Sequence, residues 1–176
     1  FSMVEIGIAE GVFHVASLLF EVPSGVISDV FGRKYSLVCG RLMGMLSSLL
    51  MAASRGLGDV CLSLVFGAFS YNFESGAREA LAYDSLKIQG KEEGYLRYSA
   101  ADMMIYRVGG ASSSLLAGLS LVLGYRIANL LDAAMDFVCL ILALRLKEVR
   151  IEPAPSGENA GMRIVRCVKE TIGFLT

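Results

Sequence analysis

Five long apolar segments dominate the sequence and restrict what it can fold into. They lie at about residues 4–27, 35–53, 59–84, 99–122 and 126–146. Each is close to the roughly 20 residues that an α-helix needs to cross a bilayer. The segments are rich in Leu, Ala, Gly, Met and Ser, and they lack the alternation of period two that is typical of strands. Because a spanning helix satisfies its own backbone hydrogen bonds, we predict an all-α, polytopic membrane helix bundle with five transmembrane helices.

The composition excludes several other classes of protein. The chain is 55% hydrophobic and only 19% charged, which leaves too little polar surface for a soluble domain of 176 residues. The four cysteines show no CxxC spacing and the single histidine forms no His-pair motif, so we expect no disulfide, no metal and no cofactor. No basic face with interleaved aromatic residues indicates nucleic-acid binding. GxSxG, HExxH and P-loop sequences are also absent, so we do not expect an enzyme.

The basic residues of the connections predict the orientation in the membrane. If the five segments cross in alternating directions, two basic residues lie on one side, Arg55 and Arg126. Eleven lie on the other side: Arg33, Lys34, Lys87, Lys91, Arg97, Arg145, Lys147, Arg150, Arg163, Arg166 and Lys169. By the positive-inside rule, the loop at Arg33 and the C-terminal tail are cytoplasmic.

The two ends of the chain indicate a fragment with two parts. The chain begins at Phe1, and no basic segment and cleavage site mark the first apolar run as a signal peptide. We expect residues 1–150 to form a partial N-terminal transmembrane bundle. Residues 151–176 read as a cytoplasmic linker, polar and rich in Pro and Gly at 152–159, followed by the start of an amphipathic helix.

Residues 21–34 form a short charged stretch between the first two apolar segments. Gly25 and Gly32 permit close backbone approach and tight turning. Asp29 and Arg33 are four residues apart, so one helical turn would bring them together. On these residues alone, the stretch is compatible with a solvated cytoplasmic hairpin.

The spacing Gly-x3-Asp-x2-Gly-Arg-Lys in this stretch resembles the loop between the second and third helices of major facilitator superfamily (MFS) transporters. The resemblance extends over almost the whole chain, which is similar to spans two to six of an N-terminal half. Supporting matches lie at residues 20–25, 79–84 and 123–126. The chain departs from the pattern at Val30, where the family usually has a basic residue. It also lacks the Gly-Pro antiporter signature of the family's fifth span.

The resemblance implies a conformational gate, made of Gly25, Asp29, Gly32, Arg33, Lys34 and Asp84. It implies that Arg33 pairs with a carboxylate such as Asp84 at the end of the third segment. It also implies that Asp29 contacts a missing C-terminal half of the same transporter and so latches the outward-open state.

Several polar residues lie at membrane depth and are candidates for a substrate or proton path. An ionised group at the bilayer centre costs roughly 2.5–3.5 kcal/mol on insertion scales, so these residues should face the bundle or a cavity. Glu74 and Arg78 also fit a structural ion pair at i,i+4, and the small residues at 109, 110, 113 and 118 fit close helix packing. The candidates are Glu10, His14, Glu21, Glu74, Arg78, Asp132 and Asp136.

As a function, the resemblance implies a secondary transporter that moves a small molecule by alternating access. Similarity to drug-efflux members implies proton-coupled efflux of amphipathic compounds across a plasma membrane, in a prokaryote the inner membrane. Its partners would be the substrate, protons, the lipid bilayer and the C-terminal half. The alternatives are a metabolite or sugar uptake transporter, and a membrane receptor or sensor that does not transport.

Overall fold

The computed structural model describes residues 1–149, which form five long α-helices and a short 3-10 turn, η1, at Glu92–Gly94. The helices are α1 (Met3–Phe31), α2 (Arg33–Ala53), α3 (Leu57–Ile88), α4 (Tyr95–Leu123) and α5 (Tyr125–Arg145). No strand occurs in this part of the chain, so the prediction of an all-α bundle is confirmed. The predicted linker and amphipathic helix at 151–176 lie outside the described residues.

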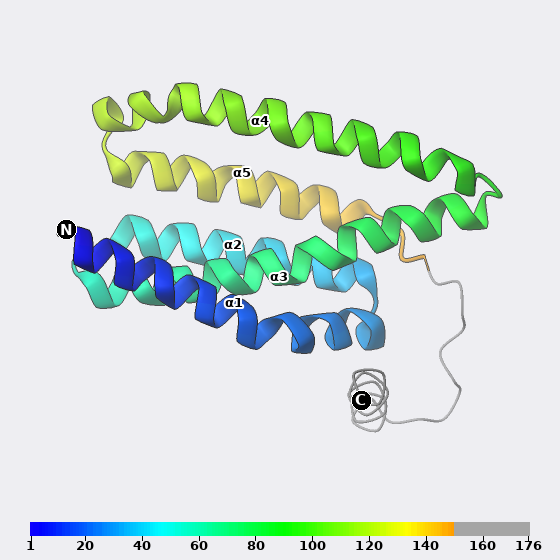
Figure 1. Ribbon diagram of the computed structural model, residues 1–176, viewed down its shortest axis with the longest axis horizontal. Helices are drawn as coiled ribbons and strands as arrows, with labels where there is room; N and C mark the ends of the chain where they lie inside the picture. Colours follow the sequence, from blue (N-terminus) through cyan, green and yellow to red (C-terminus); the bar gives the residue numbers. More distant parts are fainter. Residues whose placement is uncertain (150–176) are drawn as a thin grey trace.

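The helices run side by side, with successive helices in opposite directions (Figure 1). The helix α2 packs against both α3 and α5, and α1 packs mainly against α3, while α4 lies outermost with few contacts to α5 and α3. The α1–α2 loop, the α3–α4 connection and the end of α5 lie at the same end of the bundle (Figure 1). That end carries the basic residues Arg33, Lys34, Lys87, Lys91, Arg97, Arg145 and Lys147.

The interior is made of small side chains, whereas large apolar side chains face outward. Ala68, Ser36 and Ser63 are almost completely buried. Exposed residues include Leu18, Met104, Ile105, Val122 and Met135. This distribution is the reverse of a water-soluble core and suits a bundle whose helices approach closely inside and meet lipid outside.

Three helices, α1, α2 and α5, are long and apolar enough to cross a membrane. The helices α3 and α4 are also long enough, and α3 carries more charged residues than the other helices of residues 1–149. On α3, Glu74, Arg78 and Asp84 each form an ion pair with another part of the chain. Because these charges are paired within the bundle, the average hydropathy of α3 understates how well it fits a membrane.

The packing interpretation of the small residues on α4 is wrong for the part of the chain that the structure describes. A Cβ added at Gly109, Gly110 or Gly118 would meet no atom of another element within 4 Å. The hydroxyl of Ser114 donates to the Gly110 carbonyl of the same helix. This face of α4 is therefore open among residues 1–149.

Candidate functional site

A single residue, Gly32, separates α1 from α2 in the charged loop. Its φ of 114° lies in a region that residues with a Cβ rarely adopt. A Cβ built there would also lie 2.8 Å from Cδ of Glu148, a residue beyond the end of α5. The backbone N–H of Arg33 donates to Glu148 Oε1 at 3.0 Å, and that of Lys34 donates to Oε2 at 2.9 Å. Glu148 thus caps α2 from a distant part of the sequence.

The guanidinium of Arg33 reaches the last third of α3. Its Nη1 lies 2.5 Å from Oδ2 of Asp84, which is the pair that the family resemblance implies. The Asp84 side chain is only 8% exposed, so the carboxylate depends on this partner for its charge. The pair ties the α1–α2 loop to α3.

The expected contact between Asp29 and Arg33 is not what the structure shows. The helix α1 ends at Phe31 and a new helix begins at Arg33, so the two residues do not share one helical turn. Arg33 turns to Asp84 instead. Asp29 remains exposed at the end of α1, on the same groove as Arg33.

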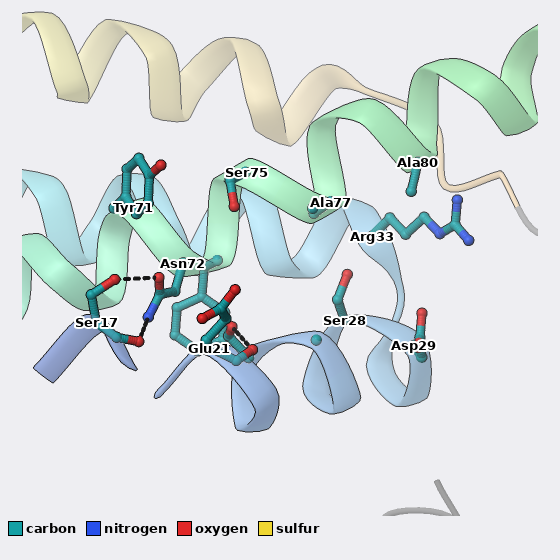
Figure 2. A pocket seen from close by; sticks show the side chains of 14 residues that line it. Ser17, Glu21, Ser28, Asp29, Arg33, Tyr71, Asn72, Ser75, Ala77 and Ala80 are labelled. Carbon is teal, nitrogen blue, oxygen red and sulfur yellow. Dashed lines mark hydrogen bonds between the residues drawn. The ribbon is translucent and has the colours of Figure 1, made fainter. Parts of the chain in front are cut away.

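A groove of about 380 Å³ lies between α1 and α3 (Figure 2). Its lining includes Glu21, Asp29 and Arg33, with Asn72 and Ser17 at its other end. Asn72 Nδ2 donates to the Ser17 carbonyl at 2.7 Å, and Ser17 Oγ donates to Asn72 Oδ1 at 2.9 Å. Asn72 is a buried polar residue of an apolar segment that the sequence analysis missed.

Glu10 and His14 lie on the surface, which corrects the expectation that they face into this bundle. Their side chains are 68% and 71% exposed, and Glu10 Oε1 is 3.8 Å from His14 Nε2. Ser17 and Glu21, about one and two turns further along α1, do line the groove against α3. This side of α1 is exposed near Glu10 and His14 and packed further along, because no described helix covers its N-terminal part.

A second charged cluster joins the middles of α2, α3 and α5. Arg41 Nη2 lies 2.5 Å from Glu74 Oε2, and Arg41 Nη1 donates to Asp136 Oδ1 at 3.1 Å. The side chains are partly buried, at 32% exposed for Arg41, 20% for Glu74 and 16% for Asp136. Arg41 was missed by the sequence analysis, although a charge inside an apolar segment is itself a signal.

The alternative of a structural ion pair between Glu74 and Arg78 is not what the structure shows. Glu74 turns to Arg41 on α2, and Arg78 Nη2 lies 3.3 Å from Asp102 Oδ2 on α4. Each of the two residues thus pairs with a residue of a neighbouring helix and not with the residue one turn away on α3.

Asp132 lies one turn before Asp136 on α5 and also faces α2. Ser48 Oγ donates to Asp132 Oδ2 at 2.8 Å. Asn129, which the helical spacing places on the same side, instead donates to the Tyr125 carbonyl of its own helix. The structure thus brings Glu74 and Asp136 together and sets Asp132 beside them.

Apolar side chains outside, small residues inside and paired charges at depth define a multi-pass membrane protein. The chain belongs to the Major Facilitator Superfamily, whose family model matches residues 1–172. This match confirms the resemblance drawn from the charged loop. The family is one of transporters.

Two relatives match shorter stretches. An uncharacterized MFS-type transporter of Methanocaldococcus jannaschii is 36% identical over 67 residues, which are 38% of this chain and 17% of that protein. An uncharacterized transporter of Buchnera aphidicola subsp. Schizaphis graminum is 31% identical over 52 residues, 30% of this chain and 13% of that protein. The matched stretch therefore spans less than a fifth of either relative. No solved structure matches this chain.

Proposed function

We propose that the full-length protein is a secondary transporter that moves small molecules by alternating access, and that this chain belongs to its N-terminal half. The observation that carries the proposal is the family match over residues 1–172. The names of both relatives describe transporters, which supports the same class. In such folds the substrate site lies near the bilayer midplane between two halves.

The gate of this transporter would be the charged loop. The Arg33–Asp84 pair and the Glu148 cap fix the start of α2, where Gly32 makes the turn and Lys34 follows it. Gly25 lies within α1, where a Cβ would meet no atom of another element within 4 Å, so the close backbone approach expected there is not seen. Asp29 is exposed beside this loop and free to contact the second half. A latch shifts the conformational equilibrium only if its contact exists in one state, which is the role we assign to Asp29.

The path for substrate and protons would use the polar residues that the bundle presents on its surface and at depth. Glu10 and His14 are available on the open face of α1, and Glu21 lies in the groove beside α3. Glu74, Asp132 and Asp136 lie deeper, and Arg78 joins α3 to α4. We propose proton-coupled efflux of amphipathic compounds across the plasma membrane, the inner membrane in a prokaryote, with the Arg33 loop in the cytoplasm.

The test is transport by the full-length protein in liposomes under an imposed pH gradient, with a panel of lipophilic cations as substrates. Asp29→Asn should insert and fold normally yet lose most transport. Arg33→Asp should lose transport and regain part of it when combined with Asp84→Arg. Full transport by Asp29→Asn would overturn the latch.

The direction of movement separates efflux from metabolite uptake in the same assay. Binding of these compounds without any movement across the bilayer would favour a receptor or sensor and overturn the transporter.

A further inference from the structure

We propose that Glu74 and Asp136 share a single proton beside Arg41, and that this site between α2, α3 and α5 binds the proton that drives transport. Only the second part, that this proton drives transport, rests on the proposed function. The proton site itself follows from the geometry of the cluster.

Charged side chains from three helices meet in this cluster. The helix α2 contributes Arg41, α3 contributes Glu74, and α5 contributes Asp136, so one fixed positive charge meets two carboxylates. An arginine guanidinium carries its positive charge throughout the physiological pH range. If both carboxylates were ionised, the cluster would carry an uncompensated negative charge in the membrane interior, which is costly. A single bound proton restores neutrality.

The charged neighbours add no net positive charge. Arg78, one turn from Glu74, also acts electrostatically on that carboxylate, but Asp102 of α4, 3.3 Å from Arg78, matches its charge. Asp132, one turn from Asp136, adds negative charge, and the hydroxyl that donates to its Oδ2 at 2.8 Å, that of Ser48, is neutral. The balance of the cluster therefore depends on a proton.

The geometry also leaves an oxygen for that proton. Glu74 Oε2 faces Arg41, while the buried Glu74 Oε1 forms no well-aligned hydrogen bond among the described residues; the hydroxyl of Ser70, one turn earlier on α3, is the uncharged side chain that acts on this carboxyl group. A buried carboxylate oxygen without a donor is unfavourable, whereas a protonated carboxyl has lost the charge that requires one. Two carboxylates that both contact one arginine are coupled, so the proton belongs to the pair and not to either residue.

The small residues of α2 make this arrangement possible. A Cβ at Gly40 would lie 2.7 Å from Glu74 Cγ, and a Cβ at Gly44 would lie 2.9 Å from both Asp136 Oδ2 and Ser70 Oγ. Because the two glycines have no side chain, Glu74 of α3 can approach α2 at Gly40, and Asp136 of α5 can approach it at Gly44. Loss of the proton would place a net negative charge at the contact of three helices, which links protonation to their packing.

The test is infrared difference spectroscopy of the full-length protein in lipid, which detects the C=O stretch of a protonated carboxyl group. The wild type should show this band at neutral pH and lose it on alkalinisation. Glu74→Gln leaves Arg41 balanced by Asp136, and Asp136→Asn leaves it balanced by Glu74. Either substitution alone should therefore remove the band.

Glu93→Gln, in the exposed η1 turn, is the control, because Glu93 lies outside the cluster and the band should persist. A band that survives in either Glu74→Gln or Asp136→Asn would overturn the shared proton. Absence of the band in the wild type would also overturn the shared proton, and this measurement does not depend on whether a variant folds.

Transport assays on the same samples separate the site from its role. A band with the expected behaviour but transport that is independent of the pH gradient would overturn proton coupling and leave the site standing. Gradient-driven transport that persists in both variants without the band would overturn the coupling role of this site and leave the transporter standing.

Discussion

Glu148 holds the backbone of Arg33, with its Oε1 3.0 Å from the Arg33 nitrogen. Its second oxygen accepts the next N–H, that of Lys34. The first N–H groups of a helix need acceptors, and Gly32, which precedes α2, has no side chain to provide one. The carboxylate also suits the positive end of the α2 dipole. The segment that follows α5 therefore contacts the proposed gate through Glu148.

We expect Glu148→Ala to destabilise the full-length protein by about 1–2 kcal/mol, the usual cost of losing a cap. Glu148→Gln keeps one acceptor oxygen and should lose less. Thermal unfolding of the purified protein in detergent measures both, with Glu93→Gln in the exposed η1 turn as the control. Equal stability of Glu148→Ala and wild type would show that the cap contributes nothing.

The same cap predicts how Gly32 and Glu148 combine. Gly32→Ala should cost about 1–2 kcal/mol for its left-handed backbone alone, and its Cβ would displace Glu148 as well. The double variant with Glu148→Ala should therefore lose less stability than the sum of the two single variants. Strict additivity would contradict the contact.

The two ion pairs that reach α3 near its C-terminal end should differ in their effect on stability. Arg33→Ala leaves Asp84 buried without its partner, and we expect a loss of about 3 kcal/mol. Arg78→Ala breaks a pair whose side chains are 47% and 30% exposed, so its loss should be about 1 kcal/mol or less. Thermal unfolding of the two variants side by side checks the order, and the reverse order would contradict it.

Hydropathy predicted the existence and the order of the helices but not their ends. The first segment was predicted to end near residue 27, while α1 continues to Phe31, and α3 continues past residue 84 to Ile88. Apolar patterns report how much of a helix lies in lipid. The backbone continues its hydrogen bonds beyond that depth until it meets a turn, as at Gly32 and Gly90.

The partners of the buried charges were harder to predict than their positions. Glu74 and Asp136 stand out in the sequence because they interrupt apolar segments. Whether Glu74 meets Arg78 or Arg41 depends on how α2 and α3 are rotated against each other, which one helix's periodicity cannot give. The Arg33–Asp84 contact was available in advance only because the loop resembles a known family. Glu148 carried no signal at all, since its role depends on where α5 ends.

The ends of the bundle predict which residues a membrane-impermeant thiol reagent can reach. We expect Glu93→Cys, between α3 and α4, to react only from the cytoplasm, because that end carries the excess of basic residues. Asp59→Cys, in the first turn of α3 at the other end, should react only from outside. The labelling would be done in a cysteine-free background of the full-length protein, with intact cells and opened vesicles compared. Labelling of Asp59→Cys only from the cytoplasm would invert the topology.

The two glycines beside the proton site should respond differently to alanine. At Gly40 the new Cβ would meet Glu74 Cγ at 2.7 Å and the Ser70 carbonyl oxygen at 3.3 Å, and that backbone atom cannot move cheaply. Gly40→Ala should therefore cost about 1–3 kcal/mol through overpacking of α2 against α3.

At Gly44 the obstacles are the ends of two side chains, Asp136 Oδ2 and Ser70 Oγ, which can turn away. Gly44→Ala should thus keep more stability than Gly40→Ala but disturb the contact of Asp136 with Arg41, and with it gradient-driven transport. Gly58→Ala, at a position with no atom of another element within 4 Å, controls for the higher helix propensity of alanine. Thermal unfolding and transport by the full-length variants measure the two effects. If Gly40→Ala were as stable as Gly58→Ala, the close approach of Glu74 to α2 would be wrong.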